Sequence, residues 1–165
     1  MDKNLQQLMD HDAIRRITAF YSDAITHLDA ARAASIYTED GVVEIVGVRT
    51  AGRDAIENGM RQSFAAFELL QLIAHGGMID VDGDLARARW STVELAIRRG
   101  SKDLNVIFGR YEDALIRQSD GWRFKQRVFT MAGRTQVQTA KLQLNPSFFT
   151  GVLSSLKTFL TWTLY

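Results

Sequence analysis

A short polar stretch near the amino terminus, YSDAITHLD at residues 21–29, combines a tyrosine, a histidine and two aspartates. An imidazole beside a carboxylate can move protons near neutral pH, which would make this stretch an acid–base site. On an ideal helix, however, Asp23 and His27 lie roughly 200° and 240° from Tyr21. Such an i, i+4 pair opposite an apolar stripe is typical of a solvent-exposed pair. We therefore expect Tyr21 to face a pocket, with Thr26 beside it, and the charged residues to face solvent.

Two residues farther along the chain are candidates for proton transfer. His75 enters a pocket if its face of the strand is concave and the Gly-Gly pair after it forms a bulge that aims it. The alternative is a strand histidine hydrogen-bonded at a rim or a dimer surface. Glu94 would have a raised pKa in an apolar cavity and could act as a general acid or base. Its alternative is a salt bridge to Arg110 or Arg127.

The remaining site candidates are wall residues. Arg127 could bind a substrate oxyanion, and Trp90 could pack on the substrate, with Asn105, Tyr111 and Phe129 as further wall residues. The sequence has three histidines without a metal-ligand spacing such as HExxH, and no cysteine, which excludes disulfides and thiolate chemistry. It also lacks a Gly-rich phosphate loop and a GxSxG elbow. We therefore expect no metal, nucleotide or other cofactor.

The bulk composition excludes several classes of partner. Hydrophobic residues make up 46% and charged residues 24% of the 165, as in a soluble globular protein of one domain. The net charge of +1 is spread along the chain, so the basic cluster needed for nucleic acid is absent. We find no signal peptide, and no apolar run reaches the roughly 18 residues of a membrane span. These features predict a cytoplasmic protein that binds neither nucleic acid nor membrane.

The first half of the chain is predicted to be mainly helical. Apolar residues recur every three or four positions over residues 12–28, which predicts an amphipathic helix capped by Asp10 or Asp12. Asp29 can cap the next, short helix. The other elements expected in this half are helices at residues 30–37 and 52–70 and one strand at residues 41–50.

The second half of the chain predicts an antiparallel meander. Long strand candidates joined by short turns occur at residues 72–81, 86–99, 104–118 and 122–133. Helices followed by a meander indicate an α+β fold, with the helices packed on one face of the sheet. Apolar residues in the 86–99 stretch point to both faces, so the outer face is expected to be covered too. A second subunit is the simplest cover, which predicts a homodimer.

The carboxyl-terminal residues form a separate unit in this interpretation. After Pro146 the apolar side chains recur at helical spacing, at Phe149, Val152, Leu153, Leu156, Phe159 and Leu160. The pattern predicts a helix that docks on the domain or on a dimer mate, and the alternative is a lid over a ligand pocket. We accordingly expect one domain at residues 1–133 and a helical extension at residues 134–165.

Four stretches taken together resemble the SnoaL-like branch of the NTF2-like superfamily: AIRRITAFYSDAITHLDAARAASIYTEDGVVEI, GRDAI, IDVDGDLARARW and GRYEDALIRQSDGWRF. The resemblance runs from about Asp12 to Met131. It implies a cone-shaped, cystatin-like α+β fold whose curved sheet wraps the first helix around a deep, mostly apolar pocket. Members include scytalone-type and bile-acid-type dehydratases, polyketide cyclases, a hexachlorocyclohexane dehydrochlorinase, ketosteroid-isomerase-like and epoxide-hydrolase-like enzymes, and the small subunits of ring-hydroxylating dioxygenases.

The resemblance also carries over to single positions. In the dehydratase-like relatives a tyrosine on the first helix is followed five residues later by an aspartate, which pairs with a histidine on the strand before a VDGD-like turn. This sequence keeps Tyr21 but has Thr26 at the aspartate position and Leu72 at the histidine position. In the bile-acid-type dehydratases the position of Glu94 is also a carboxylate. The catalytic candidates are therefore Tyr21, His75 and Glu94.

Two classes of function are consistent with these residues. The first is a cofactor-independent lyase or isomerase, dehydratase- or cyclase-like, that acts on a small hydrophobic polyketide, steroid, terpenoid or aromatic. In it Tyr21 polarises or protonates an oxygen, and His75 or Glu94 moves the proton. The second is a non-catalytic binding protein, or an accessory subunit of a dioxygenase. The loss of the aspartate and histidine at Thr26 and Leu72 favours this second class.

Overall fold

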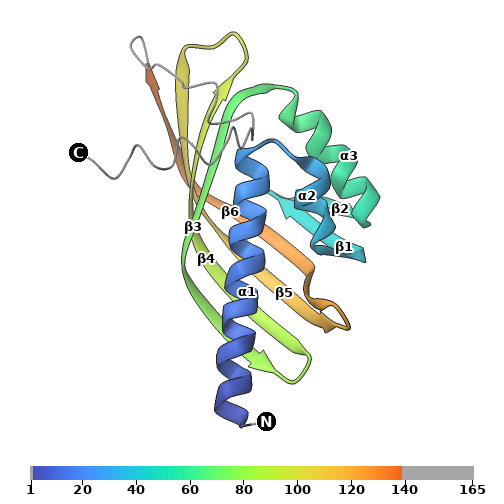
Figure 1. The fold of residues 1–165 in the computed structure, drawn as a ribbon. Coiled ribbons are helices and arrows are strands. Elements are labelled where there is room, and N and C mark those ends of the chain that lie inside the picture. The colour runs from blue at the N-terminus through green and yellow to red at the C-terminus, as the bar shows by residue number, and fades with distance from the viewer. Residues whose placement is uncertain (1, 139–165) are drawn as a thin grey trace, which may run out of the picture.

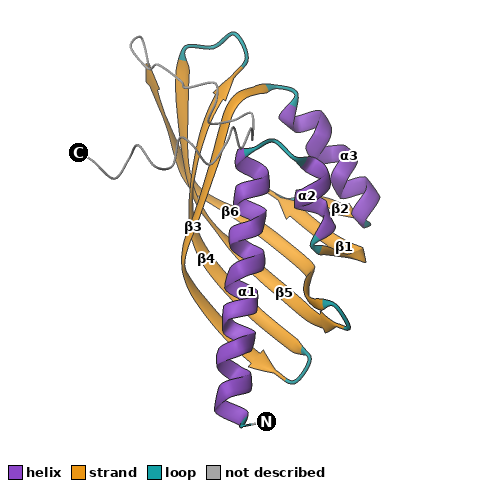
Figure 2. Ribbon diagram, viewed as in Figure 1, coloured by secondary structure: helices purple, strands orange, loops and turns teal. Residues whose placement is uncertain are grey.

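Three helices pack against one curved sheet in the computed structural model, which describes residues 2–138 (Figure 1). Helix α1, Lys3–Thr26, lies along the concave face of the sheet, and α2, Ala30–Ser35, and α3, Arg53–Phe64, follow near its carboxyl-terminal end. Figure 2 shows all three helices on the same side of the strands. The predicted α+β arrangement is confirmed.

The sheet has six strands in the order β2-β1-β6-β5-β4-β3. The strands β3 to β6 form the predicted antiparallel meander, whereas β1 runs parallel to β6. The sheet is therefore mixed rather than antiparallel, because the strand from the helical half of the chain joins the last strand of the meander. The strand bounds are β1 Tyr37–Ile45, β2 Val48–Ala51, β3 Phe67–Asp82, β4 Leu85–Arg98, β5 Asp103–Gln118 and β6 Gly121–Gln138.

The segment at residues 41–50, predicted as one strand, crosses from β1 into β2 through a tight turn. Val46 and Gly47 form this turn with φ angles of 50° and 82°. Two positive φ values are what tight hairpins favour, but a valine rarely adopts one, so the sequence did not indicate the turn. The third helix also ends earlier than predicted, at Phe64, and residues 67–70 begin β3 instead.

Helix α1 begins well before its predicted start. Asp2 is its cap, and the Asp2 side chain accepts a hydrogen bond from a backbone N–H of the first turn at 2.9 Å. Asp10 and Asp12, the predicted caps, both lie inside the helix. Asp10 is buried, and Arg117 Nη2 donates to its carboxylate at 2.8 Å. The other predicted cap is correct, since Asp29 caps α2 through its side chain.

The two faces of the sheet differ in what covers them. The hydrophobic core lies between the helices and the inner, concave face, where Trp90 and its neighbours two residues away are buried. The predicted bulge in β3 is present, because the pairing with β4 shifts between His75 and Met78. His75 precedes the bulge and pairs with Ser91, so it lies exposed on the outer face.

Three further predictions concern the domain boundary, the carboxyl-terminal residues and membranes. Strand β6 continues to Gln138, past the domain boundary expected at residue 133. The helix predicted after Pro146 lies outside the residues that the structure describes. None of the helices within residues 2–138 is both long and apolar enough to cross a membrane.

Candidate active site

A cavity of about 380 Å³ lies between α1, α3, the β1–β2 hairpin and the inner face of the sheet. Its volume falls in the range of small-molecule sites, which are concave and mostly apolar with a few polar groups. The titratable groups among its lining residues are Tyr21, Glu94 and Tyr111. The apolar lining residues are Ile25, Val43, Ile45, Val48, Ile56, Met60, Phe64, Phe67 and Leu70.

Glu94 supplies the carboxyl group of the cavity from the middle of β4. Its cross-strand neighbours on β3 and β5 are both apolar. Burial raises the pKa of the Glu94 carboxyl above its usual value, because the charged form loses its hydration. Arg110 and Arg127, the alternative partners, pair with other carboxylates, and the Glu94 side chain has no hydrogen bond or ion pair within residues 2–138.

Tyr21 and Tyr111 place two phenol groups at the same cavity. Their rings meet edge to face, with centroids 6.0 Å apart and an interplanar angle of 87°. Both side chains are buried, and burial raises the pKa of each phenol, while the positive charge of Arg127 opposes the rise. Both hydroxyls therefore stay protonated at neutral pH and can donate a hydrogen bond.

Arg127 lies behind the cavity. Its Nε and Nη2 each donate to the Asp113 carboxylate at 2.7 Å, and both side chains are 0% exposed. Trp90 Nε1 donates to the same carboxylate at 3.0 Å. The guanidinium carbon of Arg127 lies 4.4 Å from the ring centre of Tyr21 and 4.3 Å from that of Tyr111. Arg127 and Trp90 thus pack behind the phenols and are not among the residues that line the cavity.

Thr26 and Leu72, the positions at which the family resemblance has its aspartate and histidine, are neighbours in space. Thr26 Oγ1 donates to the backbone carbonyl of Ser22 at 2.9 Å and accepts from the backbone N–H of Leu72 at 3.4 Å. Both side chains are buried. The fold therefore brings the two positions together, but neither side chain has a group that ionises near neutral pH.

The other predicted site residues lie elsewhere. His75 is on the outer face of the sheet, on the opposite side from the cavity. Asn105 Nδ2 donates to the backbone carbonyl of Ala96 at 3.3 Å and lines a separate groove beside the β4–β5 turn. Phe129 packs on Tyr111 with ring centroids 5.3 Å apart and supports it from the neighbouring strand.

The charged residues of the stretch at 21–29 lie at the surface. Asp23 and His27 form an i, i+4 pair, with His27 Nδ1 3.3 Å from an Asp23 carboxylate oxygen and 2.8 Å from the Asp23 backbone carbonyl. The other Asp23 oxygen accepts from Arg32 at 2.9 Å. The expectation that this pair faces solvent while Tyr21 faces the cavity is confirmed.

The rim of the cavity was missed by sequence reasoning. Ile45 and Val48 face each other across the β1–β2 hairpin, and Met60 and Phe67 approach from α3 and β3. A signal was present in the sequence, because residues 41–48 are apolar at both even and odd positions. A strand with that pattern is usually covered on both faces, yet at the rim Ile45 and Val48 remain 40% and 70% exposed.

The sequence of this chain was compared with protein families and its fold with solved structures. A family model described as the SnoaL-like domain matches residues 6–128. The chain belongs to the SnoaL-like family. A similar solved structure, from Novosphingobium aromaticivorans, is described as an NTF2-like protein with a cystatin-like fold, so the resemblance seen in the sequence is confirmed. Among proteins of curated function, none matches this SnoaL-like sequence significantly.

Solved structures similar to this SnoaL-like chain carry several functional names. A proposed scytalone dehydratase from Novosphingobium aromaticivorans is 20% identical with a TM-score of 0.74, covering 84% of this chain and 91% of that one. A hexachlorocyclohexane dehydrochlorinase from Novosphingobium barchaimii is 16% identical, with a TM-score of 0.74 and coverages of 87% and 99%. A function-unknown protein from Mycobacterium tuberculosis is 25% identical, with a TM-score of 0.72 and coverages of 79% and 76%. These likenesses establish the fold, and function must come from the site.

Proposed function

We propose that this SnoaL-like protein is a lyase or isomerase that moves a proton on a small hydrophobic molecule, with Glu94 as the base. The observation that carries the proposal is a carboxyl group without an ionic partner, with a raised pKa, in an apolar cavity that also contains two phenols. A perturbed carboxyl in a cleft is a common mark of an acid–base site. His75 has no part in the proposal because it lies on the other face of the sheet.

The proposed reaction begins at a carbon next to a carbonyl group. The ionised Glu94 carboxylate takes a proton from that carbon, and the electron pair of the broken C–H bond moves toward the carbonyl oxygen. The hydroxyls of Tyr21 and Tyr111 donate hydrogen bonds to the developing oxyanion. In a lyase the electron pair then expels a leaving group from the β carbon, and in an isomerase Glu94 returns the proton at another carbon. Side chains perform each of these steps.

The relatives support the elimination branch of this proposal. Two of the similar structures are named a dehydratase and a dehydrochlorinase, and both names describe loss of a small leaving group from a substrate. The lining favours a neutral substrate over an anionic one, since an anion would lose its hydration without a cationic side chain among the lining residues. An apolar ketone with a leaving group on the β carbon fits both conditions.

The test is deuterium exchange into a panel of apolar cyclic ketones in D₂O, followed by NMR. This exchange reports the proton-abstraction step whether or not a leaving group is present. We expect the wild type to catalyse exchange of at least one panel member and Glu94→Gln to lower the rate by roughly 10²–10⁴-fold, the range for a general base. The matched control is Glu112→Gln, a carboxylate on the outer face of the next strand, which should exchange like the wild type. Equal rates for Glu94→Gln and wild type would remove Glu94 as the base.

A specific observation favours a second function, that of a non-catalytic binding protein. Thr26 and Leu72 occupy the positions of the aspartate and the histidine, and the backbone N–H of Leu72 donates a hydrogen bond to the Thr26 hydroxyl. If panel members bind in the cavity, detected by shifts of the Ile25 and Met60 methyl signals, and none exchanges deuterium, the binding function is the correct one.

A further inference from the structure

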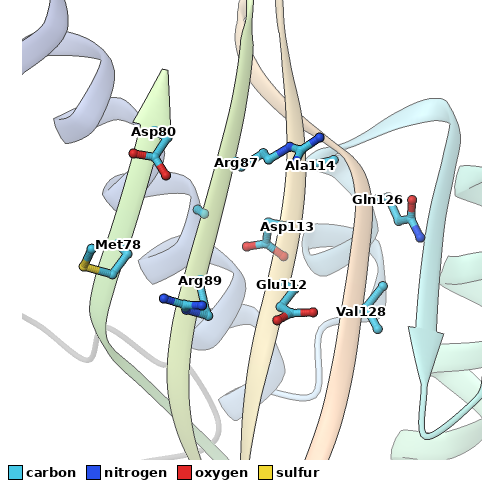
Figure 3. A pocket seen from close by; sticks show the side chains of 10 residues that line it. Met78, Asp80, Arg87, Arg89, Glu112, Asp113, Ala114, Gln126 and Val128 are labelled. Atoms are coloured by element: carbon cyan, nitrogen blue, oxygen red, sulfur yellow. The ribbon is translucent and has the colours of Figure 1, made fainter. Parts of the chain in front are cut away.

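The charged side chains are arranged differently on the two faces of the sheet. In a shallow hollow of the outer face, Asp80 on β3 is the cross-strand neighbour of Arg87 on β4 (Figure 3). Arg89 on β4 is likewise the neighbour of Glu112 on β5. Opposite charges on neighbouring strands offset each other, so this outer hollow favours neither an anion nor a cation. The inner face has a second polar hollow, and there the formal charges are all positive.

The second hollow, which we call the arginine groove, has a volume of about 360 Å³ and lies beside the β4–β5 turn. Its lining residues are Arg98, Ser101, Asn105, Arg134, Thr135 and Gln136. The lining thus contains two guanidinium groups and no carboxylate. Neither Arg98 nor Arg134 forms an ion pair within residues 2–138. Both cations of the groove are therefore available to an anionic ligand.

The arginine groove adjoins the cavity that contains Glu94. Arg98 continues the inner face of β4 beyond Glu94, since alternate residues of a strand share a face and the pairing of β4 with β5 has no register shift. The guanidinium carbon of Arg98 lies 5.3 Å from the ring centre of Phe67, which lines the cavity. In the row across the sheet, Ile107 separates Glu94 from Arg134. The cavity and the groove are therefore neighbours on one face.

The β4–β5 turn adds positive charge at the same end of the sheet, through Arg99 and Lys102. Arg99 Nε donates to the backbone carbonyl of Ala65 at 3.0 Å, which fixes the turn against the end of α3, a helix that lines the cavity. The carboxylate of Asp103 accepts from Gln136 Nε2 at 3.1 Å and is not among the groups that line the groove. Positive charge therefore prevails where the groove meets the cavity.

We propose that the arginine groove binds a carboxylate at one end of a substrate whose apolar ketone portion occupies the cavity. This inference rests on the proposed function, because it takes the reacting ketone to lie beside Glu94. A guanidinium group matches a carboxylate with two parallel N–H donors. The Cα atoms of Glu94 and Arg134 are two strand spacings apart, roughly 10 Å. The substrate is therefore an elongated keto acid, and only its neutral part is desolvated in the cavity.

The experiment compares two probes that differ in charge but hardly in shape. One is a benzoate whose para substituent is a cyclohexanone ring, joined through the carbon opposite the carbonyl, and the other is the corresponding benzamide. NMR titration of the full chain gives the Kd of each probe. The Nε–H signals of Arg98 and Arg134 report on the groove, and the methyl signals of Ile25 and Met60 report on the cavity. The Nε–H signal of Arg87, on the outer face, is the control.

We expect the wild type to bind the benzoate roughly tenfold more tightly than the benzamide, the effect of a hydrogen bond to a charged group. The signals of Arg98 and Arg134 should shift with the benzoate alone. The double variant Arg98→Gln and Arg134→Gln should lose the preference and keep the wild-type Kd for the benzamide, which shows that its cavity is intact. Arg87→Gln should bind both probes like the wild type.

Equal affinity of the wild type for the two probes would overturn the proposal, and so would a double variant that still prefers the benzoate. Absence of binding by both probes would overturn it as well. Deuterium exchange at the ketone separates this result from the proposed function. A benzoate preference without exchange would support the groove and remove the lyase or isomerase function. Exchange of both probes with equal Kd values would support that function and remove the groove as a carboxylate site.

Discussion

Glu94 lies directly opposite Leu72 in the ladder between β4 and β3. Leu72 occupies the position at which the dehydratase-like relatives have a histidine. The Glu94 carboxyl group therefore lies on the strand next to that position. An apolar neighbour cannot share the charge of Glu94, and this is part of the reason that burial raises its pKa. The candidate chemistry of this protein therefore rests on a carboxyl group in place of an Asp–His dyad.

The first prediction concerns stability and pH. Because the pKa of Glu94 is raised in the folded state, the folded protein holds this proton more tightly than the unfolded chain, and ionisation of Glu94 destabilises the fold. The free energy of unfolding of Glu94→Gln should therefore exceed that of the wild type at pH 8. The difference should disappear below the unfolded pKa of a glutamate, about 4.3. Urea titrations at pH 4 and pH 8 measure it, and a Glu94→Gln variant that is less stable at pH 8 would contradict the raised pKa.

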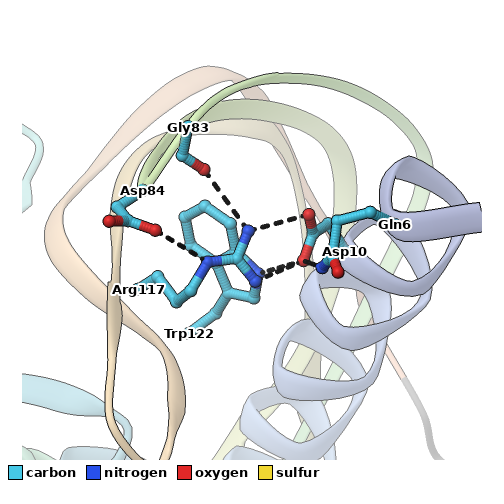
Figure 4. Close-up of polar contacts among 6 residues, drawn as sticks. All are labelled: Gln6, Asp10, Gly83, Asp84, Arg117 and Trp122. Atoms are coloured by element: carbon cyan, nitrogen blue, oxygen red, sulfur yellow. Dashed lines mark hydrogen bonds and ion pairs between the residues drawn. The ribbon is translucent and has the colours of Figure 1, made fainter. Parts of the chain in front are cut away.

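The second prediction concerns the two carboxylates around Arg117, those of Asp10 and Asp84 (Figure 4). Arg117 donates to Asp10 and to Asp84 and stacks on Trp122 at 4.5 Å. Asp10 is 4% exposed, whereas the Asp84 side chain is 78% exposed. Asp10→Asn should cost about 2 kcal/mol of unfolding free energy, as for a buried charged hydrogen bond. Asp84→Asn, at the exposed end of the same guanidinium, should cost less than about 1 kcal/mol.

The contribution of Asp10 to the free energy of unfolding should depend on pH. The hydrogen bond from Arg117 lowers the pKa of Asp10 to about 2. A lowered carboxyl pKa stabilises the fold above the unfolded pKa and loses this effect as the pH falls toward the folded value. The stability difference between wild type and Asp10→Asn should thus be constant above pH 5 and shrink between about pH 4 and pH 2. A difference that grows in this interval would show that the ion pair does not act on Asp10 as described.

The third prediction concerns the buried pair Arg127 and Asp113. Arg127→Met leaves the Asp113 carboxylate buried without its cation and should cost about 3–5 kcal/mol. Asp113→Asn removes that charge while its carbonyl still accepts from Trp90. The double variant should therefore be more stable than Arg127→Met alone, although both are less stable than the wild type. Denaturant titration of the three variants measures the coupling, and strictly additive losses would mean that the pair does not act as a unit.

The fourth prediction concerns Gly77 in the bulge of β3. A Cβ atom on Gly77 would lie 2.0 Å from the ring of Trp90, so the indole must move. Gly77→Ala should lower the unfolding free energy by about 1–3 kcal/mol, as overpacking does. Gly59→Ala, in helix α3 with open space around it, should instead raise it by roughly 0.5–1 kcal/mol. Thermal unfolding with near-ultraviolet circular dichroism checks both, and an unchanged Trp90 signal in Gly77→Ala would contradict the close approach.

Patterns within single elements of the sequence were sufficient to predict many of the residues on the inner face of the sheet and of α1. The period of α1 placed Tyr21 toward the cavity and Asp23 and His27 toward solvent, because a helix maps sequence spacing directly onto its faces. The turns between the long strands were equally local, so the meander from β3 to β6 followed from them. Glu94 was identified because it shares a strand face with Trp90, and no register shift interrupts the pairing of β4 with β5.

Other features depended on contacts between distant parts of the chain. Asp10 looked like a helix cap, yet it binds Arg117, which is 107 residues away. His75 fell on the outer face because one residue of offset at a bulge decides which face a strand residue takes. Arg127 looked like an oxyanion ligand until Asp113, on the neighbouring strand, was seen to pair with it.

For this protein the sequence by itself determined the α+β class, the SnoaL-like family, the absence of cysteine chemistry and the side of α1 that meets the cavity. The fold class, the absence of cysteine chemistry and the orientation of α1 follow from composition and from periodicity within single elements, whereas the family follows from the resemblance of the four stretches quoted above. Only the tertiary structure decided that Glu94 lacks an ionic partner within the described residues, that Arg127 stands behind the phenols, and that the β1–β2 hairpin forms the cavity rim. Burial and pairing are properties of residues brought together across the sheet, and a single strand or helix does not contain that information.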